Sequence, residues 1–92
     1  MNDILSNDFK VACQIYEMCS NGNPATHKSI YDCMQSVLTK EQISESIDTL
    51  RDWGVIKSKC VKTENGYIQT FCISNGHKER IKDLYENFIN DT

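Results

Sequence analysis

Apolar residues in the middle of the chain recur at the spacing of one helical face. Ile43, Ile47 and Leu50 are four and three residues apart, with polar residues between them. This spacing is typical of an amphipathic helix whose apolar stripe faces a core. The sequence therefore predicts a helix over residues 39–53, and we expect Trp53, at its end, to pack between this helix and the segment that follows.

Residues that commonly begin and end helices flank this stretch. Thr39 and Gln42 have the spacing of a capping box, in which each side chain bonds the backbone amide of the other residue. Gly54 follows the helix, at the position where a left-handed residue commonly closes the last turn. Both signals support the helix boundaries given by the periodicity.

Three further helices are predicted by the same periodicity, after an N-terminal arm at residues 1–5. Their ranges are 6–19, 26–34 and 77–90, and a cluster of turn-forming residues separates the first two. Buried free cysteine behaves as a small apolar residue. Three cysteines lie on the apolar faces of the first two helices and are expected in the core: Cys13, Cys19 and Cys33.

Residues 55–73 change to the pattern of strands. Two runs rich in β-branched and aromatic residues flank Asn65 and Gly66, a pair typical of the two-residue turn of a β-hairpin. With that turn, Cys60 would lie opposite Phe71. A three-residue turn would shift the pairing by one position.

Composition and charge limit the classes of function. The chain has 92 residues, 39% hydrophobic and 25% charged, which suits one globular domain over residues 1–92. No apolar run approaches the roughly 18 residues of a membrane span, and the N-terminus lacks a secretory signal pattern, so we expect a cytoplasmic protein with no membrane contact. The net charge of −3 means that a DNA-binding surface, usually basic, would require segregation of charge.

The order helix, helix, helix, hairpin, helix resembles the winged helix-turn-helix superfamily of transcription regulators. The best-matching piece runs from Thr39 to Ile56 and is similar to the family's recognition helix, with Trp53 in place of the usual aliphatic residue. The resemblance implies an α+β fold of three helices, a β-hairpin wing and a C-terminal helix. It also implies a regulator that binds double-stranded DNA in a sequence-specific manner.

In this superfamily the recognition helix enters the major groove and the wing contacts the backbone or the minor groove. Glu45 and Asp48 depart from this pattern, because carboxylates are repelled by phosphates. The lysines of the hairpin also allow an alternative to DNA contact: they could simply be solvated and protect an edge strand from aggregation. Carried over by position, the DNA contacts are Thr39, Lys40, Gln42, Ser44, Lys28, Lys57, Lys59 and Lys62, with His27, Arg51, Lys78 and Arg80 extending the basic surface.

The last helix is similar to those through which small regulators of this kind dimerise, so the resemblance implies a homodimer. Its apolar stripe is also wide for one small core. The acidic outward positions of the predicted recognition helix favour an alternative, a winged helix that binds a protein partner and no DNA. The expected dimer interface consists of Ile81, Leu84, Tyr85, Phe88 and Ile89.

Five cysteines and two histidines raise the question of metal or redox chemistry. No two cysteines have the close spacing of zinc ligands, so no metal or other cofactor is expected. No nucleophile–base pair, glycine-rich phosphate loop or H-E-x-x-H motif occurs, and we expect no enzyme. Cys60 and Cys72 lie on neighbouring wing strands, where a reversible disulfide or thiol sensor is an alternative to two free thiols.

Overall fold

The computed structural model describes residues 7–90, without the side chains of residues 88–90. The predicted arm at residues 1–5 therefore lies outside the described residues. The elements, in chain order, are α1 (Asn7–Ser20), α2 (His27–Met34), α3 (Lys40–Asp52), β1 (Ile56–Thr63), β2 (Gly66–Ile73), a 3₁₀ turn η1 (Asn75–His77) and α4 (Lys78–Asn90).

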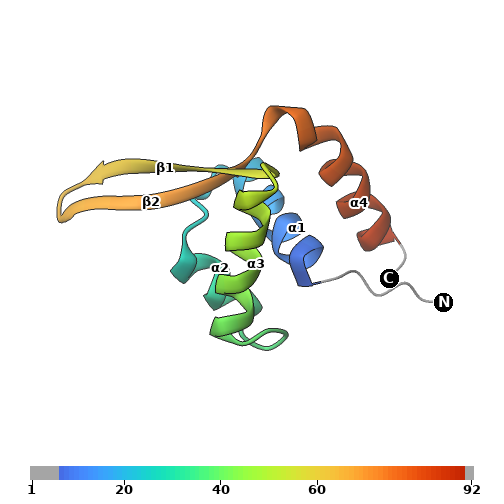
Figure 1. Cartoon of the computed structure of the whole chain (residues 1–92), viewed down its shortest axis with the longest axis horizontal. Helices are drawn as coiled ribbons and strands as arrows, with labels where there is room; N and C mark the ends of the chain where they lie inside the picture. Colours follow the sequence, from blue (N-terminus) through green and yellow to red (C-terminus); the bar gives the residue numbers. More distant parts are fainter. Residues whose placement is uncertain (1–6, 91–92) are drawn as a thin grey trace.

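The helices form one body, and the hairpin extends from it as a long wing (Figure 1). Helix α1 contacts both α3 and α4, while α2 packs on α3 beneath the wing. Strands β1 and β2 are antiparallel neighbours in a two-stranded sheet. The predicted α+β winged helix-turn-helix arrangement is confirmed.

The hydrophobic core receives side chains from all four helices and from the base of the wing. The backbone of β2 is also attached to the helical body, because Phe71 N–H donates to the carbonyl of Ala25 at 2.8 Å. Outside this base, β1 is exposed along its length. The largest fully buried side chains are Ile15, Ile30, Ile43, Ile47, Leu50, Ile56, Ile81 and Val11.

The ends of α3 have the geometry that the sequence predicts. Gln42 N–H donates to Thr39 Oγ1 at 3.1 Å, and Thr39 N–H donates to Gln42 Oε1 at 2.9 Å, which completes the capping box. At the other end Gly54 has φ 76°. There Val55 N–H donates to the carbonyl of Leu50 at 2.9 Å, so the chain turns back with Val55 and Leu50 both buried.

Two expectations about the core are wrong. Trp53 is 60% exposed, because the turn at Gly54 directs Val55, and not Trp53, toward the buried side of α3. Among the helix cysteines, Cys13 is buried as expected, but Cys19 and Cys33 are exposed.

The hairpin register differs from both predicted alternatives. The two-residue turn is Glu64–Asn65, so that Thr63 pairs with Gly66 and Cys60 pairs with Gln69 instead of Phe71. No residue other than glycine has a positive φ among the described residues, and at the turn this conformation falls on Gly66, with φ 123°. The pairing is therefore shifted by two positions from the register of an Asn-Gly turn.

This register also contradicts the proposed contact between Cys60 and Cys72. Cys72 pairs with Lys57, and Cys60 lies three positions farther along β1. Since side chains alternate between the two faces of a strand, an odd separation places the two thiols on opposite faces of the wing. A disulfide between them would need a different register.

Most of the described apolar side chains of α4 pack against the rest of the same chain. Ile81 is 1% exposed in the core, so its predicted role as a dimer contact is contradicted. Leu84 and Tyr85 are half-buried, and Tyr85 Oη donates to Glu17 Oε2 at 2.7 Å, which raises the pKa of Tyr85. The side chains of the other two predicted interface residues, Phe88 and Ile89, lie outside the described residues.

Candidate nucleic-acid interface

A groove of about 390 Å³ lies at the junction of α2 and α3. It brings together Lys28, Lys40 and Ser44, three of the predicted DNA contacts, from two different helices. Both lysines are exposed, and Ser44 is half-buried. The other lining residues are His27, Tyr31 and Ile43. The groove combines positive charge with hydroxyl donors, which suits a phosphate oxygen.

The start of α2 is held in place by two sets of contacts. Thr26 caps the helix: Ser29 N–H donates to Thr26 Oγ1 at 3.0 Å, and Thr26 N–H donates to Ser29 Oγ at 2.8 Å. The His27 ring meets the Phe71 ring edge-on, with ring centroids 5.0 Å apart. The basic end of α2 is therefore fixed relative to the base of the wing.

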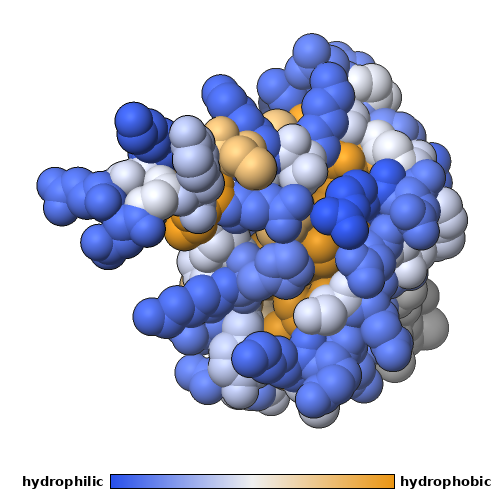
Figure 2. Space-filling view, turned by 60° about the vertical axis from the view of Figure 1, so that its left-hand side comes forward, coloured by the Kyte–Doolittle hydropathy of each residue, from blue (hydrophilic) through white to orange (hydrophobic). Residues whose placement is uncertain are grey.

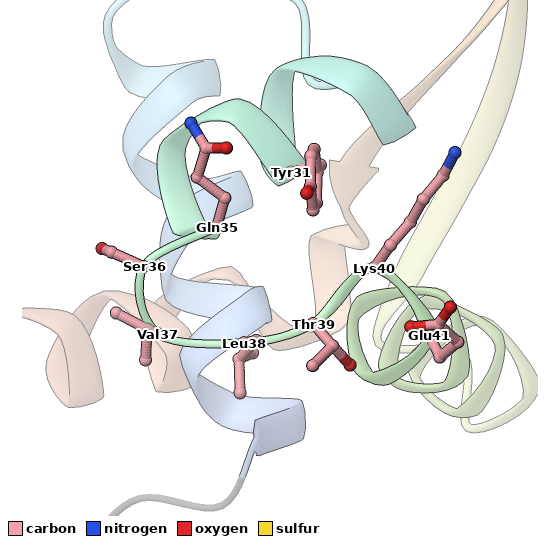
Figure 3. Close-up of a pocket in the computed structure, with 8 residues that line it drawn as sticks. All are labelled: Tyr31, Gln35, Ser36, Val37, Leu38, Thr39, Lys40 and Glu41. Carbon is pink, nitrogen blue, oxygen red and sulfur yellow. The ribbon is translucent and has the colours of Figure 1, made fainter.

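A second hollow, of about 520 Å³, is lined mainly by the turn between α2 and α3. Figure 3 shows Tyr31 of α2 and Lys40 of α3 among its lining residues, with the lysine amine extending away from the turn. Tyr31 and Lys40 line the α2–α3 groove as well.

The capping box changes the roles of two predicted contacts. Gln42 uses Oε1, and Thr39 uses Oγ1, to bond each other's backbone amides. A bidentate contact of Gln42 with adenine needs that oxygen, so it competes with the cap. The two residues lie at the exposed start of α3, but their side chains stabilise the helix.

Four carboxylates form a ridge along the most outward line of α3. Glu41, Glu45, Asp48 and Asp52 are spaced at four, three and four residues, and all are exposed. Asp48 accepts from Arg51 at 3.0 Å, so one of the four charges is paired on the helix. We call these four residues the acidic ridge. Lys40 and Ser44 lie on the side of the ridge that borders α2.

The register divides the three predicted wing lysines between two faces. Lys62 pairs with Tyr67 and lies on the face that continues outward from Phe71. Because Phe71 contacts His27 of α2, we call this the inner face of the wing. Lys57 and Lys59 lie on the opposite, outer face, together with the exposed pair Val61 and Ile68.

The surface that carries the wing and α2–α3 is predominantly hydrophilic, with a narrow apolar seam between the polar groups (Figure 2). Among the other predicted basic residues, His27 lines the α2–α3 groove, whereas Arg51 pairs with Asp48 and Arg80 lines a separate groove of about 250 Å³ beside Trp53 and Phe9. Within the described part of the chain, no three His, Cys, Asp or Glu side chains cluster as metal ligands. None of the described helices combines the length and apolarity required to cross a bilayer.

Two aromatic residues belong to this surface and were missed from the sequence. Tyr31 lies three residues after Lys28 on α2, so helical spacing alone could have placed it in the groove. Tyr67 is 76% exposed beside Lys62, and only the correct register could have revealed that pairing.

Comparisons with solved structures show which known proteins share this arrangement. A single-residue mutant of Lactococcus lactis ZitR superposes with a TM-score of 0.70 at 12% identity, over 97% of this chain and 57% of ZitR. The circadian clock associated protein Pex from Anabaena gives 0.68 at 14% identity, over 94% of this chain and 82% of Pex. A PadR family transcription regulator from Clostridium difficile gives 0.65 at 16% identity, over 92% and 91% of the two chains.

This chain has the winged helix-turn-helix fold. The winged-helix chain spans 57% of the length of ZitR, so ZitR contains substantial structure with no counterpart here. No protein-family model matches the sequence, and no curated protein does. At these identities the likeness concerns the fold, and function must be argued from the surface.

Proposed function

We propose that this winged-helix protein binds double-stranded DNA and acts as a transcription regulator in the cytoplasm. The observation that carries the proposal is the α2–α3 groove, where Lys28, Lys40 and Ser44 converge beside Tyr31. In helix-turn-helix proteins this junction faces the DNA backbone. A phosphate in the groove would receive charge from two lysines and hydrogen bonds from two hydroxyl groups.

The acidic ridge determines how α3 would approach DNA. An approach along the centre of the helix would press four carboxylates toward phosphates. An approach tilted toward α2 would place Lys40 and Ser44 nearest the backbone and leave the ridge toward the open side of the major groove. There Glu45 could accept a hydrogen bond from a cytosine amine, which provides a means of sequence readout.

The wing would contribute a second contact through its inner face. Lys62 and Tyr67 form a cross-strand pair near the tip, on the face that continues from the contact between Phe71 and His27. A lysine amine and a tyrosine hydroxyl are both suitable donors for phosphate or sugar oxygens. Lys57 and Lys59, on the outer face, are not assigned a DNA contact in this proposal.

The proposal is tested by measuring affinity for random-sequence duplex DNA between about 50 and 200 mM salt, where phosphate-driven binding falls steeply. Lys28→Ala and Lys40→Ala should each weaken binding several-fold at low salt. Each should also reduce the slope of log affinity against log salt by about 0.9, the value for one lost phosphate contact.

Lys82→Ala provides the matched control, because Lys82 is an exposed lysine on α4, away from the groove. It should leave the affinity and the slope unchanged. Binding that is absent at low salt, or that falls equally in all three variants, would refute a DNA site in the groove.

We also propose that the protein is a homodimer. The support is apolar surface near α4: Trp53 is 60% exposed beside Phe9 and Val55, and Leu84 is only half-buried. Sedimentation equilibrium of the reduced protein should give twice the mass of the 92-residue chain. A monomer at all concentrations tested would contradict the dimer but not the DNA site.

The acidic ridge favours one second candidate function, association with a basic protein surface. Four exposed carboxylates on one helical line would be complementary to such a partner and would discourage DNA. Under this alternative, the neutralisation of ridge charges would weaken partner binding, and the α2–α3 lysines would be dispensable.

A further inference from the structure

The end of α1 reaches the base of the wing, where Cys19 contacts the residue that precedes Cys72. Cys19 Sγ lies 3.4 Å from the carbonyl oxygen of Phe71, to which it donates a hydrogen bond. The next residue along β2 is Cys72. Both thiols are exposed and neither is in a disulfide. We propose that Cys19 and Cys72 form a reversible disulfide that connects α1 to β2.

The local geometry places the two residues within a short movement of each other. In a trans peptide the carbonyl oxygen of one residue lies on the same side as the Cα of the next, about 2.8 Å away. A sulfur that contacts the oxygen of Phe71 is therefore close to the Cα of Cys72. The backbone at this point is also held, since Phe71 N–H donates to Ala25 on the same edge of β2.

Electrostatic coupling supports the same proximity. Although Cys19 is exposed as a residue, partial burial of its thiol, followed by the charge of Cys72, raises the pKa of this thiol, whereas the Lys78 ammonium acts in the opposite direction. The three groups come from the end of α1, from β2 and from the first residue of α4. Lys78 would stabilise a Cys19 thiolate when one forms.

Oxidised glutathione is a suitable oxidant for the reaction. The Cys72 thiolate attacks its disulfide bond, which gives a mixed disulfide and releases one glutathione thiolate. Cys19 then loses its proton and attacks the Cys72 sulfur, so that the second glutathione leaves as a thiolate. In total two protein thiols lose two electrons and two protons, and one glutathione disulfide becomes two glutathione thiols.

The bond would fix the wing relative to the helical body. The chain between Cys19 and Cys72 includes α2, α3 and β1, so the crosslink would close a long loop and stabilise the fold. It would also restrain the base of β2 next to the contact between His27 and Phe71. If the protein binds DNA as proposed, a preorganised wing should raise its affinity a few-fold.

The test is oxidation of the full chain with glutathione disulfide, followed by mass spectrometry without reduction. Trypsin should yield peptide 11–28 linked to peptide 63–78, because cleavage follows Lys10, Lys28, Lys62 and Lys78. Peptide 63–78 contains Cys72 alone, whereas peptide 11–28 contains both Cys13 and Cys19. The Cys19→Ser variant shows which of these two cysteines forms the link. It should abolish the link, and a link that persists would overturn the proposal.

Cys33→Ser and Cys60→Ser are matched controls, because both remove an exposed thiol elsewhere. They should leave the link intact, together with a rise in Tm on the order of 10 °C that dithiothreitol reverses. Stable glutathione adducts at Cys72 without the link, or crosslinks between chains, would also overturn the proposal. This readout needs no DNA, so it stands or fails separately from the proposed function.

Discussion

The two exposed sides of α3 differ sharply in charge. Toward α2, Lys40 and Ser44 line a groove shared with Lys28. Along the outward line, the acidic ridge places a carboxylate on each turn of the helix. Both sides belong to one helix of 13 residues. The difference in charge arises because residues three or four positions apart share one side of a helix, and the residues on the two sides differ in type.

The comparison shows that net charge is a poor guide to this protein. Its overall charge of −3 results partly from the ridge, while the groove beside it is basic. Fields from exposed charges decay over about 10 Å at 0.1 M salt, so the two sides act as partly separate surfaces. Each side of α3 would therefore favour a different kind of ligand: the groove an anionic one and the acidic ridge a cationic one.

Among the variants that test this difference between the two sides of α3, neutralising the acidic ridge should change DNA affinity the most. Glu41→Gln combined with Glu45→Gln removes two exposed carboxylates without changing side-chain size. If α3 approaches DNA, affinity for random duplex at 50 mM salt should rise about tenfold, because two negative charges that the phosphates repel are removed from the helix in the major groove. The gain should shrink at high salt, where exposed charges are screened.

Glu86→Gln is the control for this experiment, since Glu86 is an exposed carboxylate on α4. It should change affinity far less than the ridge variant does. Equal gains from both would mean that only net charge matters, and an unchanged ridge variant would show that α3 does not face the DNA.

The inner and outer faces of the wing can be compared in the same way, with a smaller expected change in DNA affinity. Lys62→Ala, on the inner face, should weaken DNA binding roughly fivefold at low salt and lower the salt slope by about 0.9. Lys59→Ala removes the same charge from the outer face, three residues away, and should leave both quantities nearly unchanged. The reverse order of effects would show that the outer face of the wing contacts DNA.

The sequence predicted the elements that depend on local chemistry. The capping box, the stripe of Ile43, Ile47 and Leu50, and the turn at Gly54 are all determined by residues close in the chain. The position of Trp53 was not predictable in this way. Its burial depends on where the chain goes after Gly54, and the bond from Val55 to Leu50 turns it away from the core.

The site was predicted less completely, because it depends on register and on packing between helices. Lys28, Lys40 and Ser44 were identified individually, but their convergence required the angle between α2 and α3. The division of the wing lysines required a pairing that differs by two positions from the Asn-Gly register. The approach of Cys19 to β2 joins residues 52 positions apart, a contact for which no local pattern exists.

The smallest expected effects come from variants at the start of α3. There, one substitution should change the free energy of unfolding and another the affinity for DNA. Thr39→Ala removes one half of the capping box and should lower the free energy of unfolding by about 1 kcal/mol in a urea titration. Gln42→Glu keeps an acceptor for the Thr39 amide and adds a negative charge near the helix N-terminus, which stabilises helices. We therefore expect Gln42→Glu to preserve stability yet weaken DNA binding, whereas Thr39→Ala should lower stability with the salt slope unchanged. If Gln42→Glu leaves the affinity for DNA unaffected, the side of α3 that carries Gln42 lies away from the DNA, and contact would be limited to the side that carries Lys40 and Ser44.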